Sequence, residues 1–453
     1  MSITIKEKKS LIDNIEYINN TLLQWIKSNN GFIHKNLHIH SQIKKDHIHR
    51  NIYYKKNTSL YPNDIITKIP YNLVISIDTF NQIPGIENWE KLIDEHSKLI
   101  NKAYCNHFKI IVALLHERDK KECSFYSPYI NTLPKINSFD DHPILLYFND
   151  KHKFNILNKI SPYFTQQMDY ISNEISYIIE LFFLCNKNFP IFDSKFYSTE
   201  YLQQLVKWAF IIKKTRSWED GLVPFNDFFN HHDNSAIKLE KITQEEKLIN
   251  KNFYVFKADM QFKNIKENDE IFDNYGYYNS MILLIFFNFL QPTKVNHLSV
   301  PFDFSQNSFL NKLLLKELEK CELSSNHILL SNNGPTKDLF KILRILSLSE
   351  KELLVYKDKK GDIYENIINS KNEIKSVQLL LKLVLNMKKI SYSLENMNFI
   401  HELLISYQHK TLSSYEIIIK NVCLIMQDEY KIIEDNLHWI GEKLEAIIEE
   451  QHI

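Results

Sequence analysis

The chain has 453 residues, of which 44% are hydrophobic, and its 55 Lys and Arg are balanced by 55 Asp and Glu. This length exceeds the usual size of a single core, so we expect two or three packed units. The balanced charge gives no overall attraction to nucleic acid or to an acidic membrane surface, so neither partner is expected. The five cysteines show no CxxC spacing, which indicates neither a disulfide framework nor a zinc site, and no metal is predicted.

The N-terminus and the apolar runs bear on the cellular compartment. The first residues, Met1–Ser10, lack the apolar stretch of a secretory signal. The longest apolar runs, Ile178–Cys185 and Met281–Leu290, are much shorter than the ~20 residues that span a bilayer. We therefore predict a soluble protein of the cytoplasm or the nucleus.

The first part of the chain predicts a helix followed by small strands. Apolar residues recur at helical spacing between Leu11 and Phe32, so residues 1–32 form the predicted N-terminal helix. Short apolar stretches separated by turn residues follow from about 33 to 77 and return at Phe253–Phe262 and Glu270–Asn274, which is typical of β-strands.

The rest of the chain is predicted to be helical. Dense apolar spacing between about 86 and 212 indicates packed helices, so a helical insert interrupts a β-rich domain that spans 33–300. From Pro301 the pattern is helical almost to the end, which predicts an all-α domain over 301–453. The fold class is therefore predicted to be α+β.

Asparagine is expected to replace glycine in many turns. The chain has only 7 Gly. Asn tolerates a positive backbone φ better than other non-glycine residues do. We therefore expect asparagine to occupy turn positions that glycine often fills.

Two short segments contain the residues that most strongly indicate a function. They are Gly221–His231, which ends in Asn230-His231, and Asp269–Gly276, which contains Tyr275-Gly276. Together they resemble the two core motifs of the SET-domain protein methyltransferases. Three further segments are similar to the subfamily that contains the Rubisco-type lysine methyltransferases and the actin-histidine methyltransferase: Leu22–Gly31, Ser124–Pro134 and Trp208–Arg216.

The resemblance implies S-adenosylmethionine as cofactor and assigns residues to hold it. It implies that Asn230 and the backbone of His231 bind the cofactor, and that Arg216 offers its carboxylate a charge-assisted pair. The Gly-x-Gly motif of the family aligns with His49-Arg50-Asn51, so Arg50 and Asn51 are further predicted cofactor residues. Both glycines are replaced, and Asn lacks the ability of Gly to let a ligand approach the backbone closely.

The resemblance also implies the catalytic and substrate-binding residues. Tyr275 is the predicted catalytic residue, because its hydroxyl would orient the methyl group and the acceptor nitrogen. The predicted substrate-binding residues are Asp227 and three aromatic residues of the acceptor channel: Tyr254, Phe286 and Phe287. The C-terminal α-helical domain would bind the substrate protein.

The predicted function is an S-adenosylmethionine-dependent protein N-methyltransferase with a lysine side chain as acceptor. A desolvated aromatic channel favours the neutral amine that must attack the methyl group. Two alternatives stay open: a histidine acceptor, and a non-catalytic interaction protein that kept the SET fold with a degenerate cofactor pocket.

A histidine-rich stretch raises the alternative of a metal site. His38-Ile39-His40 would place two imidazoles on one face of a strand, as a metal site could use. No nearby cysteine or cluster of carboxylates completes a coordination shell. We therefore interpret this stretch as a solvated face.

Overall fold

The computed structural model describes the chain in fifteen stretches and divides it into two compact units. Unit 1 comprises Met1–Leu145 and Tyr170–Gly276, and unit 2 comprises Leu146–Asp169 and Tyr277–Ile453. The described residues are 5–44, 47–55, 61–97, 102–192, 196–218, 221–232, 235, 237–239, 253–258, 268–276, 278–290, 297–299, 316–318, 329–356 and 364–451.

Unit 1 holds several small sheets, among which the largest described has four strands in the antiparallel order β1-β4-β10-β9. A three-stranded sheet has the order β5-β7-β6, and β8 pairs with β11 in parallel. The strands are β1 (Phe32–Ile33), β2 (Leu37–Lys44), β3 (His47–Tyr54), β4 (Ile65–Pro70), β5 (Ile75–Ser76), β6 (Ser217–Trp218), β7 (Gly221–Leu222), β8 (Asn230–His231), β9 (Ile237–Leu239), β10 (Phe253–Ala258) and β11 (Phe272–Asp273).

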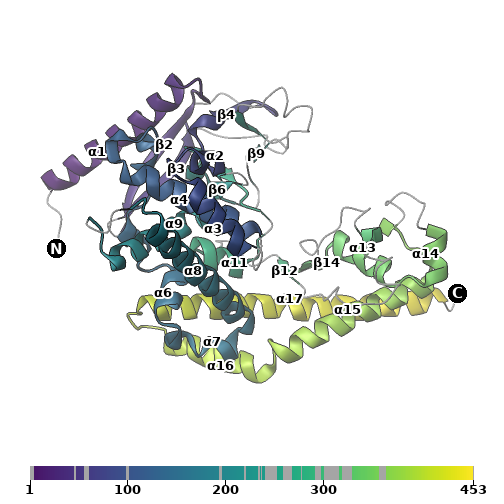
Figure 1. Cartoon of the computed structure of the whole chain (residues 1–453). Helices are drawn as coiled ribbons and strands as arrows, with labels where there is room; N and C mark the ends of the chain where they lie inside the picture. Colours follow the sequence, from purple (N-terminus) through teal and green to yellow (C-terminus); the bar gives the residue numbers. More distant parts are fainter. Residues whose placement is uncertain are drawn as a thin grey trace. The chain divides into compact units, whose positions relative to one another are not determined.

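Helices surround these sheets in unit 1, and their apolar faces form its core (Figure 1). Helices α4 and α9 bury long apolar runs: Phe210, Ile211 and Ile212 of α9 are all fully buried. Helices α6 and α8 cross the border between the two units. The helices are α1 (Ile5–Ser28), α2 (Ile77–Asn81), α3 (Glu87–Ser97), α4 (Lys102–Asp119), α5 (Ser127–Ile130), α6 (Pro143–Asn149), α8 (Pro162–Asn188) and α9 (Thr199–Arg216).

Asparagine does take positions of positive φ, as predicted. Asn63, Asn268 and Asn288 have φ of 71°, 68° and 55°. Asn30 joins them at 65° just after α1, where the N–H of Gly31 donates to the carbonyl of Ile26 at 2.8 Å and closes the helix. The low glycine content is therefore compensated by asparagine at these turns.

Unit 2 is mainly helical, and α15 and α17 run side by side along it (Figure 1). Arg344 and Glu373 form a buried bidentate ion pair, with Nε–Oε2 and Nη2–Oε1 distances of 2.8 and 2.9 Å, which joins α13 to α15. The helices are α7 (Leu157–Ile160), α11 (Ser280–Phe287), α13 (Lys337–Leu346), α14 (Glu350–Tyr356), α15 (Ser370–Ile390), α16 (Leu394–Ser406) and α17 (Ser414–Gln451).

The α+β class is as predicted, but the C-terminal part is not purely α-helical. Unit 2 contains an antiparallel sheet in the order β12-β13-β14, made of His297–Ser299, Leu329–Ser331 and Gly334–Pro335. The last two strands form a hairpin, because Ser331 pairs with Gly334 across two asparagines. Asn residues followed by Gly are a hairpin signal that the helical pattern concealed.

The two compact units also divide the chain differently from the predicted domains. The border lies at Gly276 rather than at residue 300, and residues 146–169 of the predicted insert belong to unit 2. This segment joins unit 2 because the Phe154 ring lies 5.4 Å from the Tyr415 ring, and the Asn396 amide donates to the carbonyl of Ile160 at 3.2 Å. The predicted strand Phe253–Phe262 is seen as β10, and residues 259–262 lie outside the described part.

Candidate functional site

A strained turn places the Asn230-His231 pair. Phe225 has a φ of 70° and a ψ of −41°, which is an unusual backbone conformation for a bulky side chain. Its ring is buried against Phe228 and Phe229, with centroid distances of 6.1 and 5.8 Å. Packing therefore holds the turn in a conformation that the residue alone would not adopt, and the short 3-10 helix Asn226–Phe228 leads from it to strand β8.

Tyr275 is brought against the segment that contains Asn230-His231. Its hydroxyl donates to the backbone carbonyl of Phe229 at 2.9 Å, and its backbone N–H donates to Nδ1 of His231 at 3.2 Å. Burial raises the pKa of the Tyr275 phenol, so the hydroxyl stays protonated. The predicted catalytic residue and the predicted cofactor residues thus lie together.

Glu270 joins Asn230 to Asn51. Its Oε1 accepts hydrogen bonds from Nδ2 of Asn230 at 2.7 Å and from Nδ2 of Asn51 at 2.9 Å, and its Oε2 lies 3.4 Å from the hydroxyl of Tyr53. The sequence analysis did not single out Glu270, because a glutamate that begins a short strand usually lies on a solvated face. No local signal in the sequence could have found this role.

Arg216 ends α9 and pairs with Asp227. Its Nη1 donates to the backbone oxygen and to Oδ2 of Asp227, both at 3.1 Å, and the Tyr129 hydroxyl donates to the same Oδ2 at 3.2 Å. The Asp227 side chain is fully buried, whereas that of Arg216 is 26% exposed. The structure therefore places the Asp227 carboxylate against Arg216, and its substrate-binding role stays a prediction.

A buried ion cluster fixes the helix that carries Arg216. Glu174 of α8 accepts from Nδ1 of His107 and pairs with Nζ of Lys214, both at 2.9 Å, and its side chain is fully buried. Burial alone would raise the pKa of Glu174, but the hydrogen bond from His107 and the charge of Lys214 outweigh burial and lower the pKa. The C-terminal turn of α9 is thus anchored to α4 and α8.

Arg50 and Asn51 lie in the regular strand β3, where Asn51 pairs with His40 and neither residue has a positive φ. Strand β3 therefore needs no glycine for its conformation. Arg50 donates to Oδ1 of Asn19 at 2.9 Å and to the carbonyl of Thr132 at 2.7 Å. Burial lowers the pKa of Arg50 to about 10. Its cofactor-binding role stays a prediction beside these structural contacts.

The predicted aromatic residues lie in different parts of the chain. Tyr254 is buried in β10 and packs edge to face on Tyr71 at 4.7 Å. Phe286 and Phe287 belong to α11 in unit 2 and are half-buried, and the Phe287 ring lies 6.1 Å from that of Tyr278. A place for these three residues in an acceptor channel remains a prediction.

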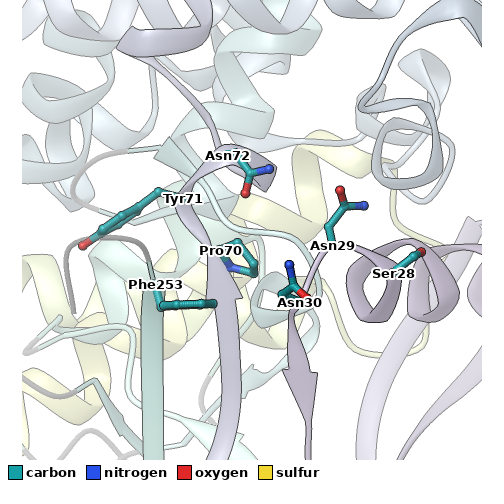
Figure 2. A pocket seen from close by; sticks show the side chains of 7 residues that line it. All are labelled: Ser28, Asn29, Asn30, Pro70, Tyr71, Asn72 and Phe253. Carbon is teal, nitrogen blue, oxygen red and sulfur yellow. The ribbon is translucent and has the colours of Figure 1, made fainter. Parts of the chain in front are cut away.

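A pocket of about 390 Å³ opens beside the end of α1 (Figure 2). Tyr71, which contacts Tyr254, is one of its lining residues, but none of the predicted site residues lines it. The others are Ser28, Asn29, Asn30, Pro70, Asn72 and Phe253.

The histidine-rich stretch forms one face of the β2–β3 hairpin. His38 is opposite Tyr53 and His40 is opposite Asn51, and both imidazoles lie near the Tyr53 ring, at 5.9 and 5.4 Å. Within the described residues, no group of three or more His, Cys, Asp or Glu side chains could hold a metal ion.

Among the described helices, no segment is long and apolar enough to cross a membrane.

The site fits a ligand that carries both a carboxylate and polar groups. Both hydrogen bonds of Arg216 use Nη1, so within the described residues its Nη2 and Nε face no protein acceptor. Three buried polar atoms near Arg216 and Tyr275 also have no hydrogen-bond partner in the described part of the chain: Asn226 Nδ2, Asp227 Oδ1 and Asp273 Oδ2. Buried polar atoms without partners are uncommon in proteins, so these atoms call for an explanation.

Comparisons with known proteins establish the fold. The structure is similar to the SET domain of LSMT bound to lysine and AdoHcy, with a TM-score of 0.56, 15% identity, and coverage of 95% of this chain and 92% of that one. It is also similar to Rubisco LSMT bound to AdoMet, with a TM-score of 0.52, 15% identity and the same coverages. The chain therefore has the SET-domain fold that its motifs predicted.

One sequence relative agrees with this fold. SET domain-containing protein 4 of Artemia parthenogenetica is 23% identical over 291 residues, which cover 58% of this chain and 66% of the relative. The match thus spans slightly less than two thirds of the relative. No protein-family model matches the chain.

Proposed function

We propose that this chain is an S-adenosylmethionine-dependent protein methyltransferase whose acceptor is a lysine side chain. One observation carries the proposal: the Tyr275 hydroxyl and the Asn230-His231 segment meet in a SET fold, with the hydroxyl 2.9 Å from the carbonyl oxygen of Phe229. In this arrangement a phenol lies beside the segment that is predicted to hold the methyl donor.

The residues of unit 1 fit this cofactor. Arg216 is held by Asp227, whose carboxylate also accepts from Tyr129, and it would pair with the cofactor carboxylate through its remaining N–H donors. Asn230 would contact the cofactor in an orientation that Glu270 fixes. Asn51 stands where the Gly-x-Gly motif has its second glycine. Its side-chain amide is held by a hydrogen bond to the Glu270 carboxylate.

Catalysis in this site depends on positioning. When bound, S-adenosylmethionine would supply a methyl group on a sulfonium, and the S–C electron pair would stay on sulfur as the acceptor nitrogen took the methyl group. The Tyr275 hydroxyl, fixed by Phe229 and kept protonated by burial, would orient the methyl group and the acceptor nitrogen. The surrounding buried aromatic residues would exclude water.

Lysine is the acceptor that the similar structures favour. One of them is Rubisco LSMT bound to sinefungin and monomethyllysine, with a TM-score of 0.54. There are two alternatives: a histidine acceptor, and an interaction protein without catalytic activity. The substrate would be a protein.

Calorimetry with S-adenosylmethionine tests the proposal first. We expect saturable binding well below about 1 mM, a concentration at which even weak specific sites fill. If no binding is seen at that concentration, the proposal of an enzyme is wrong and an interaction protein is favoured. If the cofactor binds, labelled cofactor and an extract of the protein's own cells, followed by mass spectrometry of labelled peptides, will show whether lysine or histidine is methylated.

A further inference from the structure

The segment Ser124–Pro134 is fastened by hydrogen bonds to two elements of unit 1 that carry predicted site residues. Arg50 of β3 donates to the carbonyl of Thr132 at 2.7 Å. Tyr129 of the same segment donates from its hydroxyl to Oδ2 of Asp227 at 3.2 Å. The second of these contacts reaches the ion pair whose arginine is predicted to bind the cofactor.

The Tyr129 hydroxyl is held in place by the protein core. Tyr129 is fully buried, and the Thr132 hydroxyl donates to its carbonyl at 2.6 Å. Burial raises the pKa of the Tyr129 phenol well above its usual range. The hydroxyl therefore stays protonated around neutral pH, and it remains a hydrogen-bond donor to Asp227.

The Asp227 carboxylate uses one oxygen for both of its side-chain donors. Its Oδ2 accepts from the Tyr129 hydroxyl at 3.2 Å and from Nη1 of Arg216 at 3.1 Å. Its Oδ1 is buried and has no hydrogen-bond partner within the described residues. Arginine often binds a carboxylate through two parallel hydrogen bonds, one to each oxygen. Here the pair has a single side-chain bond, and Nη1 makes its second bond to the Asp227 backbone oxygen at 3.1 Å.

This one-sided pair leaves part of the Arg216 guanidinium available. Its Nη2 and Nε face no protein acceptor in the described part of the chain, and its side chain is 26% exposed. Burial raises the pKa of Asp227, and the charge and hydrogen bond of Arg216, with the hydrogen bond from Tyr129, act against this rise. Without the Tyr129 hydroxyl, Arg216 would be the only side-chain donor to this carboxylate among the described residues. The carboxylate would then be free to turn Oδ1 toward Nη2 or Nε and accept a second bond.

We propose that Tyr129 is a positioning residue that holds Asp227 in a one-sided pair with Arg216 and so reserves Nη2 and Nε of Arg216 for the carboxylate of the cofactor. The inference rests on the proposed function, in which Arg216 binds this carboxylate. Tyr129 acts through Asp227 and not by contact with the ligand, because its side chain is fully buried. Its hydroxyl sets how many donors of the arginine are used within the protein.

Two ligands separate this role from a general effect on the fold. S-adenosylhomocysteine carries the amino-acid carboxylate, whereas methylthioadenosine has the same nucleoside and a thioether but lacks the amino-acid part. Calorimetry measures the affinity of the full chain for each ligand, with and without Tyr129→Phe, which keeps the ring and removes the hydroxyl. We expect the variant to fold, to bind S-adenosylhomocysteine about three- to tenfold more weakly, and to bind methylthioadenosine within about twofold of the wild type.

Two further variants serve as control and as rescue. Tyr126→Phe removes a hydroxyl of the same segment that lies 3.3 Å from Oγ1 of Thr79, and it should leave both affinities unchanged. Asp227→Asn replaces the carboxylate by a neutral amide, which cannot form a bidentate ion pair with Arg216. In this background Tyr129→Phe should change the affinity for S-adenosylhomocysteine by less than about twofold.

Each outcome decides between a positioning role and a structural one. If Tyr129→Phe weakens the binding of both ligands equally, weakens neither, or does not fold, the inference is wrong while the proposed function stands. An equal loss of S-adenosylhomocysteine affinity with and without Asp227→Asn would also contradict the inference. This second comparison decides the matter if methylthioadenosine binds too weakly to measure. If the wild type does not bind S-adenosylhomocysteine at all, the proposed function itself fails.

Discussion

Asn230 and Glu270, which are 40 residues apart in sequence, are joined by a 2.7 Å hydrogen bond from the amide Nδ2 to Oε1. The same oxygen accepts from Asn51, which is 219 residues away from Glu270. One carboxylate therefore fixes two side chains that are predicted to contact the cofactor. This link ties β3 to the Asn-His segment.

Removal of the Glu270 carboxylate should weaken cofactor binding. Glu270→Ala leaves the amides of Asn51 and Asn230 without their acceptor, and we expect S-adenosylmethionine to bind about tenfold more weakly or worse. Glu270→Gln keeps an acceptor oxygen and should recover most of the affinity. Calorimetry measures both, with the exposed Asp269→Ala as control. Equal affinity of the Ala variant and the wild type would remove Glu270 from the site.

Substitution of Arg216 tests its predicted pair with the cofactor. Arg216→Lys keeps a charge near Asp227 but cannot offer a planar, bidentate fork, so cofactor affinity should fall by about 10- to 100-fold. Thermal unfolding should stay within a few degrees of the wild type. Arg118→Lys is the control, because Arg118 stacks on Trp208 at 4.9 Å and has no proposed role in the site. Unfolding of the Arg216 variant would indicate a structural role only.

Loss of the Tyr275 hydroxyl should separate binding from transfer. Tyr275→Phe removes the donor to the Phe229 carbonyl and should cost about 1 kcal/mol of stability, with cofactor affinity little changed. Methyl transfer from labelled cofactor should fall by about 100-fold or more, because the phenol no longer orients the reacting groups. Tyr126→Phe, at a buried tyrosine whose hydroxyl lies 3.3 Å from that of Thr79, is the matched control. Unchanged transfer by Tyr275→Phe would contradict the catalytic assignment.

Asp273 should make stability depend on pH. Its pKa is about 7 in the folded chain and 3.8 ordinarily, so the folded state holds the proton more tightly than the unfolded state. The resulting destabilisation is absent below about pH 4, grows as the pH rises to about 7, and is complete above it. Asp273→Asn cannot ionise, so we expect it to be about 2–4 kcal/mol more stable than the wild type near pH 8 and similar near pH 4. Urea unfolding at both pH values measures this difference, and a less stable variant near pH 8 would contradict the burial of a charged Asp273.

Asparagine in the left-handed region should be replaceable by glycine but not by alanine. Asn288 ends α11 with a φ of 55° and a ψ of 38°. Asn288→Gly should stabilise the protein by about 0.5 kcal/mol, and Asn288→Ala should destabilise it by about 0.5–1 kcal/mol. Thermal unfolding of the two variants gives the comparison. Equal stabilities would show that the backbone there is not strained.

The sequence by itself determined the elements and the motifs of this protein. Periodic apolar residues predicted α1, the helices between 86 and 212 and parts of α15 and α17, because a helix or strand imposes its spacing locally. The Asn-His and Tyr-Gly motifs predicted the SET fold, and low glycine content predicted asparagine at positive φ. Local pattern missed the β13–β14 hairpin, whose turn is short and lies among helices.

Only the tertiary structure decided which side chains meet. Glu270 and Asp273 are near neighbours in one short segment of the sequence, yet one accepts from Asn51 and Asn230 while the other is buried without a side-chain partner in the described part of the chain. Whether an acid is paired depends on residues that the chain topology brings from far away, at separations of 219 residues for Asn51 and 40 for Asn230. Local spacing does not encode such distances, so the burial of Asp273 and the partners of Glu270 could be found only from the folded chain.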